Sequence, residues 1–166
     1  MSAADDARQA LVILRSRVDA HFEAARERSP RSLACTEGCH DCCHPGLSVF
    51  ELEAAPIRDA LMRIDPGSRE RVRGQGADPR SDRCALLLDG RCSVYAQRPL
   101  ICRSHGLPVA DDAGQVSWCP LNFTAGQVPG PSVLRLPVLN GSLGVAAHML
   151  DGSGRRVELA ALARGE

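Results

Sequence analysis

The chain contains no lysine. All twenty of its basic residues are arginine, and twenty acidic residues balance them, so that the formal net charge is zero. This balance excludes the broad positive field with which proteins attract nucleic acids or anionic membranes. The absence of lysine also excludes Schiff-base chemistry and the lysine of a phosphate-binding loop. We therefore expect neither a nucleic-acid partner nor a membrane partner.

Aromatic side chains and long apolar runs are scarce as well. Aromatics make up 3% of the 166 residues, and no stretch approaches the roughly 18 consecutive apolar residues of a membrane-spanning helix. The first residues, Met-Ser-Ala-Ala-Asp-Asp, carry acids where a signal peptide needs basic residues. We expect a cytoplasmic protein with reduced thiols, folded as one domain over residues 1–166. So lean a core also predicts that metal ligation contributes to folding.

Cysteine, by contrast, is abundant and clustered. Four of the eight cysteines fall within the segment Cys35–Cys43, and the others follow at Cys84, Cys92, Cys102 and Cys119. Ligands of one inorganic centre recur at short intervals, whereas buried structural cysteines scatter along a chain. The spacing suits an iron-sulfur cluster and tetrahedral zinc equally. The sequence therefore predicts a protein that binds a metal ion, leaves zinc and an iron-sulfur cluster undecided, and points to no particular protein partner.

Three other functions fit parts of this pattern. The x3, x2 cysteine spacing occurs in radical S-adenosylmethionine enzymes, but those need a large α/β barrel that this chain does not supply. Cys39-His40-Asp41-Cys42 has the spacing of a thiol-disulfide oxidoreductase, yet the accompanying βαβ pattern is missing. A metal-dependent enzyme with an open coordination position is the third alternative, although no paired carboxylates or nucleophile accompany the cysteines.

Hydrophobic periodicity predicts an α-rich (α+β) fold of about four helices, with one or two short β-hairpins around the cysteines. A long amphipathic helix is expected over residues 4–28, with Ser2 and Asp5 as a capping box. A second helix is expected after Ser48, and Pro56 predicts that it is kinked or begins later. The other expected elements are a polar helix near residues 68–73, a hairpin turning at Asp89-Gly90, a short helix from Arg98-Pro99, a hairpin near residues 112–114 and a helix over residues 137–150.

Several histidines are further ligand candidates, because neutral imidazole binds metals well. Those beside the cysteines are His40, His44 and His105. His105 is the best candidate of the three. His21 lies in the apolar stripe of the first expected helix, and we interpret it as an interfacial residue rather than a ligand.

The adjacent pair Cys42 and Cys43 is the hardest part of the cluster to explain. Neighbouring side chains point in different directions in both helices and strands, so one mononuclear site seldom takes both. The pair is consistent with two metals, with two atoms of a polynuclear cluster, or with one thiol that packs into the core.

The pattern Cys-x3-Cys-x2-Cys-Cys, the pair Cys84 and Cys92, and the run Ser-Val-Tyr-Ala-Gln-Arg-Pro-Leu-Ile-Cys-Arg over residues 93–103 resemble the YkgJ-type cysteine-cluster family. Members of that family are described as chelators of zinc or iron. The resemblance covers residues 35–105, which are expected to form the metal-binding core. The chain departs from the family signature in one respect, because three residues rather than two separate its first two cysteines.

The resemblance implies one set of metal ligands and two arginines beside it. The implied ligands are Cys35, Cys39, Cys42, Cys43, Cys84, Cys92 and Cys102, and His105 joins this set as the histidine candidate named above. Arg98 and Arg103 are expected nearby, where their guanidinium groups would offset the negative charge of several thiolates. Cys119 lies outside the resemblance, and its role is left open.

Overall fold

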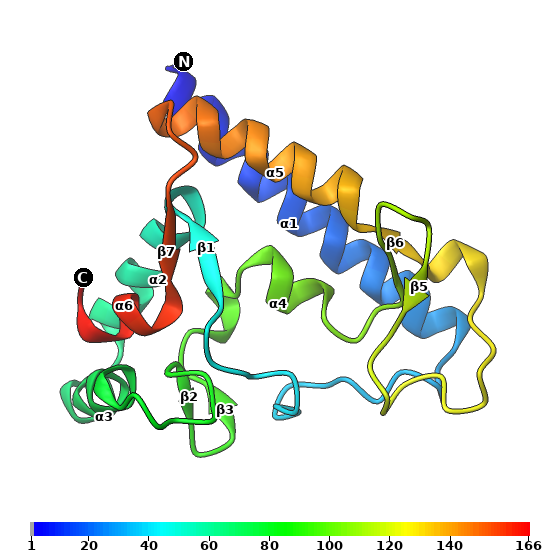
Figure 1. Ribbon diagram of the computed structural model, residues 1–166, viewed down its shortest axis with the longest axis horizontal. Helices are drawn as coiled ribbons and strands as arrows, with labels where there is room; N and C mark the ends of the chain where they lie inside the picture. Colours follow the sequence, from blue (N-terminus) through cyan, green and yellow to red (C-terminus); the bar gives the residue numbers. More distant parts are fainter. Residues whose placement is uncertain (1) are drawn as a thin grey trace.

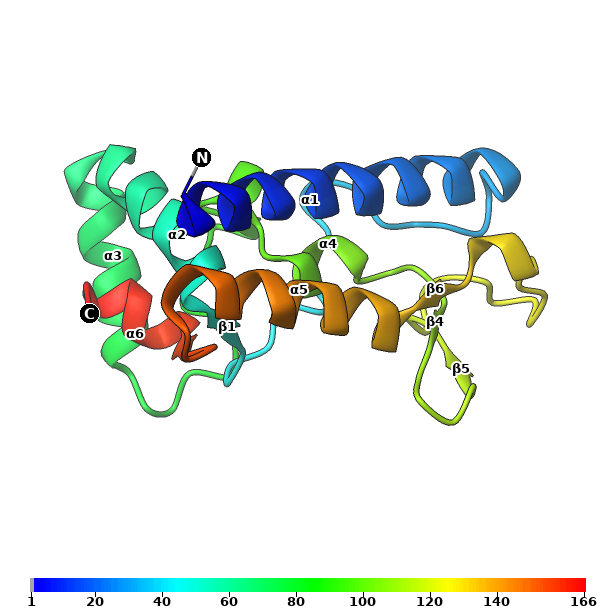
Figure 2. The same cartoon turned by 90° about the horizontal axis from the view of Figure 1, so that it is seen from above.

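Two long helices form one side of the molecule and run antiparallel to each other (Figures 1 and 2). They are α1, Ala3–Arg28, and α5, Leu136–Asp151. The expected capping box is present, since Ser2 accepts from the Asp5 N–H and the Asp5 carboxylate accepts from Ser2. Ala7 lies among the buried residues of α1 that face α5. The structure thus confirms both long helices to within a few residues.

The structure, a computed structural model, describes residues 2–166. Its shorter helices are α2 (Glu51–Arg63), α3 (Pro66–Ala77), α4 (Leu100–Ser104) and α6 (Leu159–Arg164), with single 3-10 turns η1 (Tyr95–Gln97) and η2 (Gly130–Ser132). The strands of the described residues form three small sheets. They are β1 (Ser48–Phe50) with β7 (Arg156–Glu158), β2 (Leu87–Leu88) with β3 (Arg91–Cys92), and β4 (Val109–Ala110) between antiparallel β5 (Val116–Ser117) and parallel β6 (Leu134–Arg135).

The predicted α-rich (α+β) class with short hairpins is confirmed, although the described residues hold six α-helices rather than about four. Both expected hairpins are present. None of the helices within residues 2–166 is long and apolar enough to cross a bilayer.

The start of the second helix differs from the prediction. Ser48 does not cap a helix, because Ser48–Phe50 is a strand that pairs with Arg156–Glu158 and α2 begins only at Glu51. The partner strand lies more than a hundred residues away, so local sequence could not indicate it. Pro56 lies inside α2, where it removes one internal hydrogen bond of the helix.

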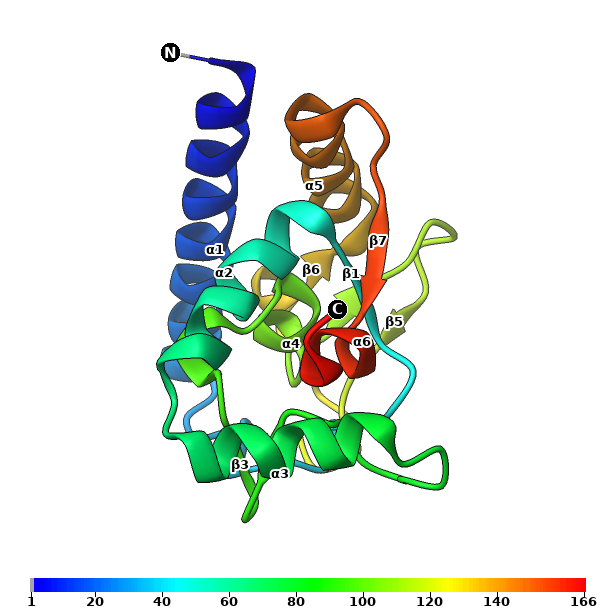
Figure 3. The same ribbon diagram turned by 90° about the vertical axis from the view of Figure 1, so that its left-hand side faces the viewer.

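The first hairpin forms where its turn residues predicted it. Asp89 and Gly90 have positive φ of 49° and 76°, which suits a type I′ turn, and Leu87 pairs with Cys92 across the ladder. α3 lies crosswise to α1 (Figure 3) and holds this hairpin. The Gln75 side-chain amide donates to the carbonyls of Ala85 and Leu87, each at 3.0 Å.

The core consists of three small clusters rather than one large one. The first joins α2, α3, α6 and the β2–β3 hairpin, the second joins α1, α5 and the start of α4, and the third surrounds Phe123. Cys84 and Cys92 pack against the first cluster. The cysteine loop, residues 35–44, crosses the space between the hairpin and α4 (Figure 1).

A buried carboxylate anchors the start of α4. Glu53 of α2 is 2% exposed, and its Oε1 accepts from the Leu100 N–H at 2.7 Å. Burial raises the pKa of Glu53, against the opposite effects of this hydrogen bond and of the Arg15 charge. Glu53 of α2 therefore anchors the first residue of the short helix that carries Cys102.

We predict that Glu53→Ala lowers the free energy of unfolding by about 1–3 kcal/mol, because the Leu100 N–H loses its buried acceptor. Glu53→Gln keeps an acceptor oxygen and is the matched control. The raised pKa means that folded wild type binds a proton at Glu53 more tightly than the unfolded chain, so its stability falls as the pH rises through that pKa. Urea unfolding at several pH values should show that the free energy of unfolding of Glu53→Gln rises relative to that of wild type as the pH rises. Equal stability of the Ala and Gln variants at neutral pH would contradict this role.

Candidate metal centre

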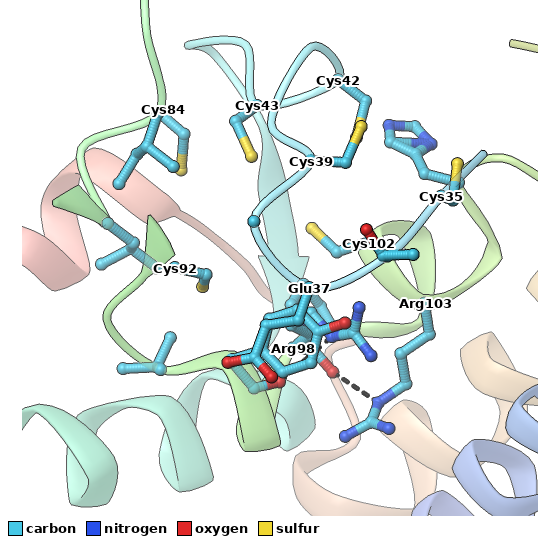
Figure 4. A pocket seen from close by; sticks show the side chains of 18 of the residues that line it. Cys35, Glu37, Cys39, Cys42, Cys43, Cys84, Cys92, Arg98, Cys102 and Arg103 are labelled. Atoms are coloured by element: carbon cyan, nitrogen blue, oxygen red, sulfur yellow. Dashed lines mark hydrogen bonds between the residues drawn. The ribbon is translucent and has the colours of Figure 1, made fainter. Parts of the chain in front are cut away.

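All of the predicted metal ligands line one cavity of about 310 Å³. They come from three separate segments, which are the cysteine loop, the β2–β3 hairpin and α4 with the residue after it. Figure 4 shows their sulfur atoms along the walls of this space. All eight cysteines of the chain are free thiols of intermediate exposure.

The cysteine loop is shaped by two successive turns. The Cys39 N–H donates to the Thr36 carbonyl at 3.0 Å, and the Cys43 N–H donates to the His40 carbonyl at 2.9 Å. Gly38, inside the first turn, has φ of 96°, a left-handed conformation that glycine adopts without strain. The turns satisfy backbone donors within the loop, and they place thiols from both turns on the same cavity.

The hairpin is attached directly to this loop. The Cys84 N–H donates to the Cys43 carbonyl at 2.9 Å. At the other end of the hairpin, a Cβ on Gly90 would lie 3.4 Å from the His40 ring, so the turn packs closely against the loop. The predicted approach of Cys84 and Cys92 is seen in their placement on one side of the cavity (Figure 4).

α4 supplies Cys102, and His105 follows the helix as its C-cap. The two arginines nearby differ in their contacts. The Arg98 guanidinium lies 3.6 Å from the centre of the Tyr95 ring, and its charge lowers the pKa values of Cys92 and Cys102 against the larger effect of burial.

Arg103 forms its hydrogen bonds with a carboxylate of α1 and with backbone carbonyls rather than with the thiols. Its guanidinium donates to Asp19 of α1 at 2.6 Å and to the Arg98 carbonyl at 2.8 Å, and it also bonds the Ala96 carbonyl. Its side chain is 9% exposed. Both arginines line the cavity, but the contacts of Arg103 are those of a brace between α1 and α4.

Burial governs the acidity of most of the thiols. It raises the pKa values of Cys35, Cys84 and Cys92, and it raises that of Cys102 to about 12. The neighbouring thiols of Cys42 and Cys43 act on each other in opposite directions, so that the pKa of Cys42 is raised and that of Cys43 is lowered. Most thiols are therefore protonated at neutral pH without a cation, and metal binding must displace those protons.

Sequence reasoning missed Asn122, which is fully buried beside the cluster. Its side-chain oxygen accepts from the Ala34 N–H at 2.8 Å, while its nitrogen donates to the Gly106 carbonyl at 2.7 Å and to the Cys35 sulfur at 3.2 Å. Its own N–H donates to the Cys119 carbonyl at 2.9 Å. No motif marks Asn122 in the sequence, because its role depends on three segments, residues 34–35, Gly106 and residues 119–122, that meet only in the fold.

The other candidate residues lie as follows. Cys119 and His44 line a second, mainly apolar cavity, which Cys42 and His105 also border. His40 carries a buried Nδ1 for which no hydrogen-bond partner is present among the described residues. His21 Nε2 lies 3.0 Å from the Ser132 carbonyl, as expected of an interfacial residue.

The donor set fits zinc or iron by its chemistry. Sulfur donors with imidazole nearby suit zinc and iron-sulfur centres, whereas carboxylate-rich sites suit harder ions. Within residues 2–166, no three histidine, cysteine, aspartate or glutamate side chains lie close enough together to hold one metal ion. The thiols share cavity walls rather than a common point, so ligation requires rotation of thiol side chains or an inward shift of the loop.

Comparison with known families agrees with this chemistry. A family model of the CxxCxxCC type, described as "Putative zinc- or iron-chelating domain", matches residues 34–120. The match covers more than half of the chain, which therefore belongs to this family. It reaches past Cys102 and includes Cys119. Neither a curated protein nor a solved structure matches the chain.

We predict that Asn122→Ala lowers the free energy of unfolding by at least about 2 kcal/mol, because each buried partner left unpaired costs about 1–3 kcal/mol. Asn140→Ala, at an exposed position of α5, is the control and should change stability by no more than about 0.5 kcal/mol. Denaturant unfolding of the metal-free proteins measures both. A similar small effect in the two variants would show that Asn122 does not hold these segments together.

Proposed function

We propose that this chain binds zinc or an iron centre through the thiolates of its cysteine loop, its β2–β3 hairpin and α4. The observation that carries the proposal is that all eight predicted donors, from three segments spread over seventy residues, line one cavity. Membership in a family described by zinc or iron chelation supports metal binding. The residues proposed to hold the metal are Cys35, Cys39, Cys42, Cys43, Cys84, Cys92, Cys102 and His105.

The electrostatics of the cavity support the same proposal. Thiols whose pKa values are raised by burial gain most from a cation, which stabilises their ionised form. Arg98 supplies positive charge on the same side as Cys92 and Cys102, where it would offset the negative charge of a multi-thiolate centre. When bound, zinc would act as a structural clamp, whereas an iron-sulfur cluster could also transfer electrons.

We infer that the protein works in a reducing compartment such as the cytoplasm. Thiolate ligation requires the cysteines to stay reduced, and all eight are free thiols. Disulfide formation within the loop would remove ligands.

A metal-dependent or redox enzyme is the second candidate function, and one observation favours it. Cys42 and His105 border both the thiol-lined cavity and the second, mainly apolar cavity beside it. A small molecule in the second cavity would therefore lie next to the metal centre. Small-molecule sites are commonly apolar cavities with a few polar groups at one end.

The proposal predicts that metal is part of the folding equilibrium. A ligand present at about 1,000 times its Kd stabilises the folded state by about 4 kcal/mol, which corresponds to a rise in Tm of roughly 10 °C for a chain of this length. Chelation under reducing conditions should lower the Tm by about that amount, and adding zinc back should restore it. The measurement is calorimetry with elemental analysis of the same samples.

The variant Cys42→Ser should abolish most of this metal-dependent rise, because a hydroxyl is a harder and far less acidic ligand than a thiol. His148→Ala, which removes an exposed imidazole from α5, is the control and should retain the full rise. A wild-type Tm that is the same with and without metal would show that any bound metal is peripheral to the fold.

A further inference from the structure

The donors divide into two groups, one beside the hairpin and one around Asn122. Of the second group, Cys35 lines the thiol-lined cavity, Cys119 lines the second cavity and His105 borders both. One group, which we call the hairpin group, contains Cys43, Cys84, Cys92 and Cys102. Cys84 is bonded through its backbone to Cys43, and Cys92 pairs with Leu87 in the same hairpin. Figure 4 shows Cys84 and Cys92 at one end and Cys35 at the other.

The second group, which we call the Asn122 group, contains Cys35, Cys119 and His105. Asn122 holds all three segments, since it bonds the Cys35 sulfur, the Cys119 carbonyl and the carbonyl of Gly106, which follows His105. The contact is close, because a Cβ on Gly106 would lie only 2.3 Å from the Cys35 sulfur. A hydrogen bond from a buried amide to a sulfur is the kind of outer contact that orients a metal ligand.

Two thiols of the loop lie between the groups, and the adjacent cysteines there differ in what they face. Cys42 borders both cavities, whereas Cys43 borders only the thiol-lined one. In Figure 4 the Cys39 and Cys42 side chains lie together between the two ends. The adjacent pair thus faces two directions, as side chains of neighbouring residues must.

The number of donors exceeds the needs of one ion. A zinc site takes four ligands in tetrahedral geometry, whereas the hairpin group alone supplies four thiols and the Asn122 group supplies three donors with Cys39 and Cys42 beside it. A single four-coordinate ion would leave more than half of these donors without a role.

We propose that the chain holds two metal ions side by side, one bound by the hairpin group and one bound by the Asn122 group, with Cys42 facing both. This inference rests on the proposed metal-binding function and assigns Cys119 to the second ion. It also gives the pair Cys42 and Cys43 a purpose, because Cys43 then binds the first ion alone, whereas Cys42 faces both ions.

The test is the number of zinc ions that the full chain binds. Apoprotein kept reduced and free of oxygen is titrated with Zn²⁺ against a chromophoric chelator, and metal per folded chain is measured by elemental analysis after gel filtration. Wild type should bind two ions. Cys119→Ser, in the Asn122 group, and Cys92→Ser, in the hairpin group, should each keep one, and the double variant should keep none. Circular dichroism checks that each variant is folded, and the wild-type stoichiometry needs no variant at all.

The outcomes separate this inference from the proposed function. One ion in wild type, complete loss of zinc in either single variant, or two ions in Cys119→Ser would overturn the two-ion arrangement and leave metal binding intact. Acid-labile sulfide in the purified protein, in amounts equal to its iron, would replace the two ions with one polynuclear cluster. No zinc and no iron bound to wild type would overturn the proposed function itself.

Discussion

The cysteine cluster depends on one physical constraint, which is that a half-buried thiol can lose its proton only if positive charge replaces water around it. Burial raises the pKa values of Cys84 and Cys92 and brings that of Cys102 to about 12, and several thiolates in one cavity would repel one another. A metal cation removes both costs at once. The same constraint weighs against thiol-disulfide chemistry at the thiols whose pKa is raised, because a reactive cysteine needs a lowered pKa. Among the thiols whose pKa is shifted, that of Cys43 is lowered and the others are raised.

Buried and half-buried polar side chains, rather than a large aromatic core, attach the segments that bear the thiols. Glu53 holds the start of α4, Gln75 holds the hairpin through two carbonyls, and Asn122 joins the start of the cysteine loop to Gly106. Each fixes the position of a segment by directional hydrogen bonds. The three hydrophobic clusters are small, so apolar packing alone gives these segments little support. Such a scaffold places the thiols on the walls of one cavity, and binding of the cation then draws them together.

Local signals in the sequence predicted much of this fold, and long-range pairing accounts for most of what they missed. The capping box of Ser2 and Asp5 and the turn at Asp89-Gly90 act over a few residues, and both appear as expected. Such local signals fail at Ser48, where the residues predicted to cap a helix instead form a strand that pairs with residues 156–158. The cysteine spacing likewise indicated the ligand-bearing loop, but Asn122 carries no local signature, since its partners come from segments far apart in the chain.

X-ray absorption at the metal edge tests the central claim most directly, because it reports which atoms surround the metal. In protein purified without oxygen and loaded with zinc or iron, the account predicts a first shell dominated by sulfur, at about 2.3 Å for zinc, with at most a minor nitrogen contribution from His105. A first shell made only of nitrogen and oxygen would contradict a thiolate centre, however tightly the metal is held.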